Sequence, residues 1–179
     1  GSSDFTVAEV AAKAGVALRT FYRQFAGRDE LLLALFEEEA RQGAELLQDS
    51  VTAEGTTPIE HLRGYVVGLC RLLDVGSGYA SLLVREHLRL GESHPEELRV
   101  ALAPIVDLLE EQLQAAAASG DLRPVDRHDA VVVFTAVLAH VHASVLFTEG
   151  ERSEVSAERL WDFCHAALRA TAASELEAP

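Results

Sequence analysis

Apolar residues recur at helical spacing along most of the chain, and capping residues or glycines mark the ends of each run. The first run begins at Thr6, which has capping-box spacing with Glu9, and Gly15 ends it. The same signals, capping residues at helix starts and glycines at helix ends, predict helices over 7–14, 18–25, 28–52, 58–76, 79–90, 93–119, 126–147 and 154–171. No alternating apolar and polar pattern indicates a strand, so the expected fold class is all-α.

The composition is typical of a soluble globular protein. Of the 179 residues, 49% are hydrophobic and 25% are charged, which excludes a disordered chain. The most apolar stretch, 130–147, includes Thr135, His140, His142 and Ser144. These polar residues favour a buried helix over a membrane span, and we expect no membrane contact.

The charge divides the chain into two parts. The net charge is −14. Residues 1–36 hold four basic and four acidic side chains, whereas residues 37–179 hold 11 basic and 25 acidic ones. This asymmetry indicates two functional units, 1–36 and 37–179, and the acidic unit is expected to stay away from nucleic acid.

The sequence contains no motif of catalysis or metal binding. Cys70 and Cys164 lie in apolar helical patterns and are expected to be free and buried, which fits a reducing cytoplasm. The seven histidines include no HxxxH pair, so we expect no metal and no other cofactor. We also expect no enzyme activity, since no nucleophile motif and no phosphate-binding glycine loop are present.

Two short helices joined by a tight turn at Gly15 predict a helix-turn-helix, whose second helix enters the DNA major groove. Its small core is expected to contain Val10, Ala14, Val16, Phe21 and Phe25. The outward residues of the second helix suit contacts to bases and phosphates: Leu18, Arg19, Thr20, Tyr22, Arg23 and Gln24. A solvated helix face with a few arginines would show the same pattern.

Three motifs carry a family resemblance: T-V-x-x-V-A-x-x-A-G-V at 6–16, T-F-Y-R-x-F at 20–25, and a glycine, basic, acidic, E-L-L segment at 27–32. Together these motifs resemble the DNA-binding domain of TetR-type (tetracycline-repressor-like) transcriptional regulators. The resemblance covers about 31 residues, and the rest of the chain matches in size, helicity and helix order. It implies a helix-turn-helix domain over 1–36 and a helical-bundle domain over 37–179 for ligand binding and dimerisation.

The resemblance also implies roles for single residues. Thr6 would cap a helix that points at the phosphate backbone, Arg19 and Thr20 would face bases, and three side chains would hold phosphates: Tyr22, Gln24 and Arg28. Ala17 stands where the family commonly has a Ser or Thr cap, a loss of about 1 kcal/mol in helix stability. The family has one helix before this motif, so the first helix of the domain is expected to be missing from this sequence.

In the family, the last two helices form a four-helix bundle with those of a second subunit. By resemblance, the candidate dimer interface comprises Val141, Val145, Leu160, Trp161, Cys164 and Leu168. A place in the subunit's own core explains each of these apolar residues equally well.

A ligand pocket is expected among the apolar helices of 37–179. His87 shares a helix stripe with Tyr79, Leu83 and Leu90, which places a polar group among apolar ones. The candidate pocket residues are Tyr65, Leu69, Tyr79, Leu83, Arg85, His87, Leu109, Phe134, Val137 and Leu138. They favour an apolar or aromatic effector with a carboxylate or hydroxyl for Arg85 or a histidine. The alternative is ordinary core, with His87 hydrogen-bonded to a glutamate or the backbone.

The expected function is therefore a ligand-responsive repressor that binds near-palindromic double-stranded operator DNA as a homodimer. A small, largely apolar effector would release it. The alternative is a helical protein-interaction module that no longer binds DNA, which the net charge of −14 would favour.

Overall fold

A computed structural model describes the chain over residues 5–50, 57–73, 77–147 and 154–169. These residues form α1 (Val7–Lys13), α2 (Leu18–Gln24), α3 (Arg28–Ser50), α4 (Pro58–Leu73), α5 (Ser77–Ser93), α6 (Pro95–Ala101), α7 (Ala103–Ala118), α8 (Arg127–Phe147) and α9 (Glu154–Leu168). Within the described residues there is no strand, and one isolated bridge pairs Leu122 with Arg169. The all-α prediction is confirmed.

Local capping sets the ends of the first helices as the sequence predicts. The Glu9 amide donates to Oγ1 of Thr6 at 3.2 Å, and the Thr6 amide donates to the Glu9 carboxylate at 2.7 Å. Gly15 ends α1 with a φ of +69°, a conformation that glycine adopts without strain. Ala17 begins α2 without a side-chain cap.

Two predicted helix boundaries are wrong. α5 continues through Gly91 to Ser93, whose hydroxyl bonds back to the Arg89 carbonyl at 3.0 Å. Ser93 therefore closes α5 instead of capping the next helix. The helix predicted over 93–119 is two helices, α6 and α7, because the ring nitrogen of Pro104 has no hydrogen to donate to the preceding turn.

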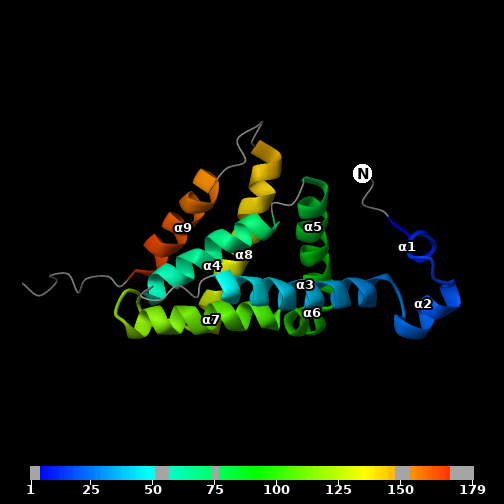
Figure 1. Ribbon diagram of the computed structural model, residues 1–179, viewed down its shortest axis with the longest axis horizontal. Helices are drawn as coiled ribbons and strands as arrows, with labels where there is room; N and C mark the ends of the chain where they lie inside the picture. Colours follow the sequence, from blue (N-terminus) through cyan, green and yellow to red (C-terminus); the bar gives the residue numbers. More distant parts are fainter. Residues whose placement is uncertain (1–4, 51–56, 74–76, 148–153, 170–179) are drawn as a thin grey trace, which may run out of the picture.

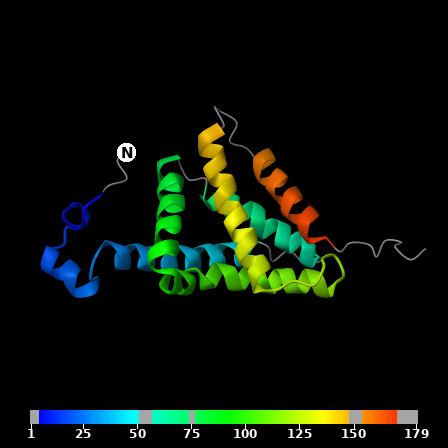
Figure 2. The same cartoon turned by 180° about the vertical axis from the view of Figure 1, so that it is seen from behind.

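The long helix α3 joins the two parts of the molecule. Figure 1 shows α1 and α2 at one end of α3, beyond the other helices, while α6 and α7 run along its length. The view from behind shows α8 crossing α7, with α9 at the end opposite α2 (Figure 2). The predicted boundary between residues 36 and 37 falls inside α3, so no linker separates the two units.

The larger part has one continuous apolar core. Its largest fully buried apolar side chains are Leu62, Val66, Leu90, Leu109, Leu113 and Val137. Gly68 allows α4 to approach α3 closely, since a Cβ there would lie 2.5 Å from a methyl carbon of Leu47. Cys70 and Cys164 are buried thiols that form no disulfide within the described residues, as predicted.

The small core between α1 and α2 contains fewer of the predicted residues than expected. Ala11 and Phe21 are buried, with the Phe21 ring 5.4 Å from that of Phe25. Ala14 and Val16 are exposed, which corrects their predicted place in this core. They lie at the end of α1 and in the turn that follows it, where no helix covers them.

None of the helices in the described ranges is long and apolar enough to cross a membrane.

Candidate DNA-binding surface and ligand cavities

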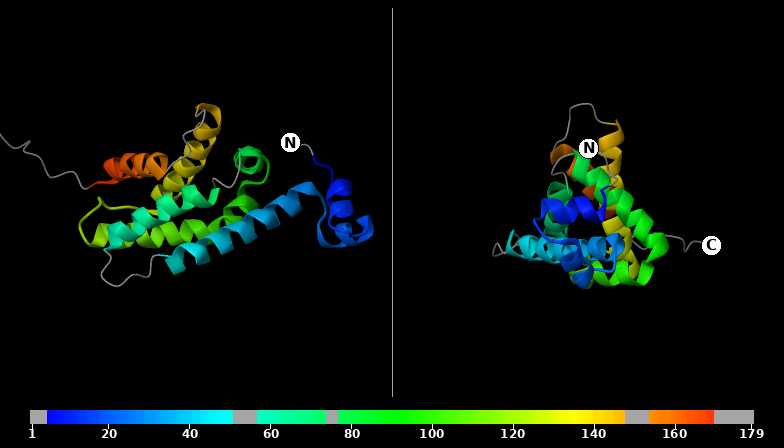
Figure 3. Two further views of the ribbon diagram at one scale, coloured as in Figure 1. Left: turned by 45° about the horizontal axis from the view of Figure 1, so that its top comes forward. Right: turned by 90° about the vertical axis from the view of Figure 1, so that its right-hand side faces the viewer.

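The α2 helix presents a polar and basic surface at the free end of the molecule. Arg19, Arg23 and Gln24 are exposed, Leu18 and Tyr22 are 45% and 57% exposed, and Thr20 is half-buried. The end-on view places α1 and α2 in front of the helical body (Figure 3). One face of α2 packs through Phe21, so its other residues are free to meet a groove or a phosphate backbone.

Arg28, for which the family resemblance implies a phosphate contact, lies against α5 in the structure. Its guanidinium donates to the Glu86 carboxylate of α5 at 2.7 Å and lies 4.7 Å from the centre of the Phe5 ring. Only 28% of the side chain is exposed. The structure thus holds Arg28 against a buried carboxylate of α5, and its contact with a DNA phosphate stays a prediction.

Glu86 ties α5 to the start of α3. It is 2% exposed, and its carboxylate accepts hydrogen bonds from Arg28, Arg85 and Arg89 at 2.7–3.1 Å. Arg89 also binds Asp29 with two bonds, at 2.6 and 3.1 Å. We call these five residues the Glu86 cluster. It joins α5 to the first turn of the helix that follows α2.

The Glu86 cluster keeps its carboxylates charged. Burial alone would raise the pKa of Glu86, but hydrogen bonds from Arg89, Arg28 and Arg85 outweigh burial and lower it. The hydrogen bonds from Arg89 likewise lower the pKa of Asp29. Three arginines against two carboxylates make a compact network of charge-assisted bonds.

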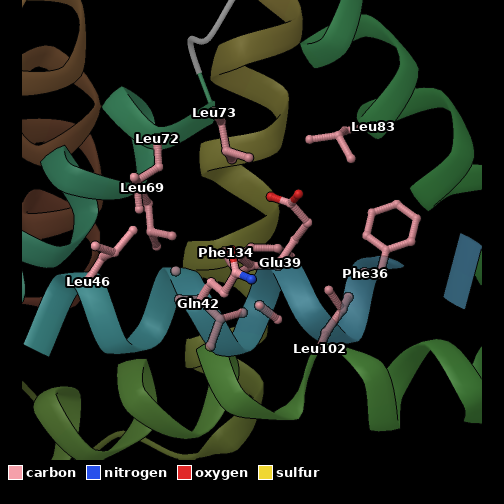
Figure 4. Close-up of a pocket in the computed structure, with 13 residues that line it drawn as sticks. Phe36, Glu39, Gln42, Leu46, Leu69, Leu72, Leu73, Leu83, Leu102 and Phe134 are labelled. Atoms are coloured by element: carbon pink, nitrogen blue, oxygen red, sulfur yellow. The ribbon is translucent and has the colours of Figure 1, made fainter. Parts of the chain in front are cut away.

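One cavity, of about 130 Å³, lies between α3, α4, α5, α7 and α8, and we call it the α3–α4 cavity. Its walls are mainly apolar: Phe36, Leu46, Leu69, Leu73, Leu83, Leu102 and Phe134. Figure 4 shows the Glu39 carboxylate rising from α3 toward the space between Leu73 and Leu83. Gln42 is another polar side chain in the lining.

The predicted pocket residues are only partly brought together. Leu69, Leu83 and Phe134 line the α3–α4 cavity, and His87 lines a neighbouring cavity with Phe134. Other candidates are buried core residues that line neither cavity: Tyr65, Leu109, Val137 and Leu138. Arg85 joins the Glu86 cluster instead, and the side chain of Tyr79 lies outside the described part of the structure.

The predicted interface residues face inward. Val141, Leu160, Trp161, Cys164 and Leu168 are 5–8% exposed in the isolated chain, because α8 and α9 pack these residues against the rest of the same subunit. Their predicted place in a dimer interface stays a prediction, and the side chain of Val145 lies outside the described residues. The outward side of the two helices shows a different apolar set: Val132, Ala139, Ala143, Phe163, Ala166 and Ala167.

Among the described residues, no group of three His, Cys, Asp or Glu side chains has the arrangement of a metal site. The two cavities and the α2 surface are therefore the features from which function must be argued.

Comparison with known proteins identifies the N-terminal segment. Residues 1–35 match the family model of bacterial regulatory proteins of the tetR family. The chain carries a TetR-type N-terminal domain. A search of curated protein sequences found no match.

Several solved structures share the fold of the chain beyond its N-terminal domain. FadR from Bacillus subtilis, in complex with stearoyl-CoA, has a TM-score of 0.75 at 19% identity, over 92% of this chain and 89% of that one. A putative tetR family transcription regulator from Shewanella sp. PV-4 has a TM-score of 0.75 at 17% identity, over 96% of this chain and 88% of that one. The ketosteroid regulator KstR2 of Mycobacterium tuberculosis has a TM-score of 0.56 at 17% identity, over 93% of this chain and 86% of that one.

Identities this low establish a common fold and no common ligand. Together with the match of residues 1–35, the TetR-type fold supports a DNA-binding transcriptional regulator.

Proposed function

We propose that the protein is a ligand-responsive repressor that binds near-palindromic operator DNA in the cytoplasm as a homodimer. The observation that carries this proposal is the exposed polar face of α2, held at the end of α3 and linked through the Glu86 cluster to α5. Arg19 and Thr20 would face bases, while Tyr22, Arg23, Gln24 and the capped Thr6 end of α1 would meet phosphates.

The effector proposed for the α3–α4 cavity is a small, largely apolar molecule. Leucines and phenylalanines supply most of the wall, and Glu39 and Gln42 supply acceptors for a hydroxyl or amino group. Two structural neighbours, FadR in complex with stearoyl-CoA and the ketosteroid regulator KstR2, are consistent with apolar ligands in this fold.

The effector would act on DNA binding through α5 and α3. Phe36 on α3 and Leu83 on α5 both line the α3–α4 cavity, and the Glu86 cluster joins the same two helices beside α2. A ligand that separates α3 from α5 would change the position of α2 in each subunit. Because binding is reciprocal, operator DNA would weaken effector binding by the same factor, typically 5–150-fold.

The outward apolar side of α8 and α9 is the proposed dimer surface. Phe163 is 69% exposed there, an unusual place for a large aromatic side chain in a monomer. We expect Phe163→Glu to turn a dimer into a monomer, because a charge would replace the most exposed large apolar side chain of this surface. Light scattering after gel filtration measures the mass. The matched control is Leu88→Glu, at a 62% exposed position on α5, which should leave the dimer intact.

Salt dependence of binding to a random-sequence DNA duplex tests the proposal against the protein-interaction module. We expect the affinity to fall steeply with salt and Arg23→Ala to reduce the salt slope by about one, since one phosphate-neutralising charge is lost. The control is Arg41→Ala on α3, whose guanidinium is occupied by Glu38 and Glu45. No DNA binding at low salt, or equal effects of the two substitutions, would contradict the proposal.

A further inference from the structure

The end of α1, the turn after it and the start of α2 form a continuous exposed surface over residues 12–19, which we call the 12–19 surface. It has two charged side chains, Lys13 and Arg19, and no acidic one, in a chain whose net charge is −14. Between these two basic residues lie only alanine, glycine, valine and leucine. The basic residues suit a polyanion, and the apolar residues between them suit an apolar group carried by that polyanion.

Leu18 is the largest apolar side chain of the 12–19 surface. It is the first residue of α2, and 45% of it is exposed. α2 packs on α1 through Phe21, whose ring lies 5.4 Å from that of Phe25, so the small core does not cover Leu18. Tyr22, one turn after Leu18 on the same side of α2, is 57% exposed. This side of α2 therefore presents apolar surface to a partner outside the chain.

Two arginines, Arg19 and Arg23, lie beside Leu18 on α2. Among the described residues no carboxylate pairs with either guanidinium. Elsewhere in the chain, Arg99 and Arg127 are held by carboxylates at 2.8 and 2.6 Å. The guanidinium groups of α2 are thus available to DNA: Arg23 to a phosphate, and Arg19 to a base next to the position of Leu18.

The major groove of DNA offers one kind of apolar group at its base edges. Every base presents hydrogen-bond donors or acceptors there, and thymine also presents its C5-methyl group. In helix-turn-helix proteins the N-terminal residues of the second helix contact base edges. Leu18 occupies this position and its side chain has no hydrogen-bonding group. The partner that matches it in the groove is therefore the methyl group of thymine.

We propose that Leu18 is a specificity-determining residue that packs against the C5-methyl group of one thymine in each half-site of the operator. The inference rests on the proposed binding of operator DNA through α2. It adds the identity of one base in the half-site and the chemical group by which that base is recognised.

Deoxyuridine tests the methyl group, because it keeps the hydrogen-bonding groups of thymidine and lacks the C5-methyl. The probe is the duplex that the wild-type protein enriches from random sequences, with each thymine replaced in turn. At one thymine of each half-site we expect deoxyuridine to weaken binding about fourfold, the effect of one buried methyl group. Replacement in both half-sites should weaken binding about 16-fold. Fluorescence anisotropy measures the affinities.

Leu18→Ala tests the residue. Alanine favours a helix and Leu18 lies outside the small core, so α2 should stay folded, which circular dichroism checks. We expect this variant to bind the thymine and deoxyuridine duplexes with equal affinity. Leu18→Met, which keeps a long apolar side chain, should retain the difference between the duplexes. The matched control is Leu88→Ala, at a 62% exposed position on α5, which should also retain it.

Two results would overturn the inference and leave operator binding in place. One is equal affinity of the wild-type protein for thymine and deoxyuridine at every position. The other is a difference between the duplexes that persists undiminished in Leu18→Ala. If the wild-type protein enriches no duplex, the proposed function fails, and this inference fails with it.

Discussion

Glu86→Gln lowers the free energy of unfolding by about 3 kcal/mol, the low end of the cost of breaking a buried ion pair. The glutamine keeps the size of the side chain and removes the charge that holds Arg28, Arg85 and Arg89. The cost stays at the low end because the three guanidinium groups remain partly hydrated, with 28–46% of each side chain exposed. Urea denaturation of both proteins at pH 7 measures the difference.

The control for Glu86→Gln is Glu38→Gln, which removes the same charge from an ion pair with Arg41 on the exposed side of α3. No measurable change is expected there, since water replaces an exposed ion pair. Equal stabilities of Glu86→Gln and Glu38→Gln would contradict the structural role of the Glu86 cluster.

The contribution of Glu86 to stability depends on pH. The folded pKa of Glu86 is lowered, so its contribution is fully present above the ordinary glutamate pKa of about 4.3. The contribution is lost as the pH falls through the folded pKa. The difference in stability between the wild type and Glu86→Gln should therefore shrink as the pH falls below about 4.3.

The second large effect concerns the small core that holds α2 in place. Phe21→Ala removes the largest buried side chain of this unit among the described residues, at a cost of about 3 kcal/mol. Only Ala11 and Phe21 are buried among the described residues of this unit, so we expect the substitution to exceed the stability that its small core provides. We therefore expect α1 and α2 to unfold while the larger core stays folded. DNA binding should fall at least about 100-fold, with a main thermal transition like that of the wild type.

Circular dichroism during heating measures the thermal transition, and fluorescence anisotropy with a labelled DNA duplex measures DNA binding. Val16→Ala is the control, because Val16 is 41% exposed in the turn between α1 and α2. It should keep both stability and DNA binding. A larger loss of stability and DNA binding in Val16→Ala than in Phe21→Ala would contradict this result. It would instead support the place in the small core that the sequence predicts for Val16.

Helix order and the outward face of α2 were predictable because local signals set them. Capping at Thr6 and Gly15 acts within one turn of helix, and the period of α2 determines which side chains lie opposite Phe21. The break between α6 and α7 also has a local cause in Pro104, a signal present in the sequence but not used.

The Glu86 cluster and the cavity walls were not predictable in the same way. Nothing in the sequence separates Glu86 from exposed glutamates such as Glu92, since burial depends on where α5 crosses α3. Phe36 and Glu39 line the α3–α4 cavity because α3 continues from the DNA-binding unit into the larger core. Helical spacing also cannot distinguish a buried residue such as Trp161 from an exposed residue such as Phe163, because both are large and apolar.

The central claim is that two copies of this chain read DNA sequence through α2. Selection of binding sites from a pool of random duplexes tests it most directly. The account predicts an enriched near-palindrome whose half-site centres lie about 34–36 Å apart along the DNA, bound by a dimer. Absence of any enriched sequence, even at low salt, would contradict it.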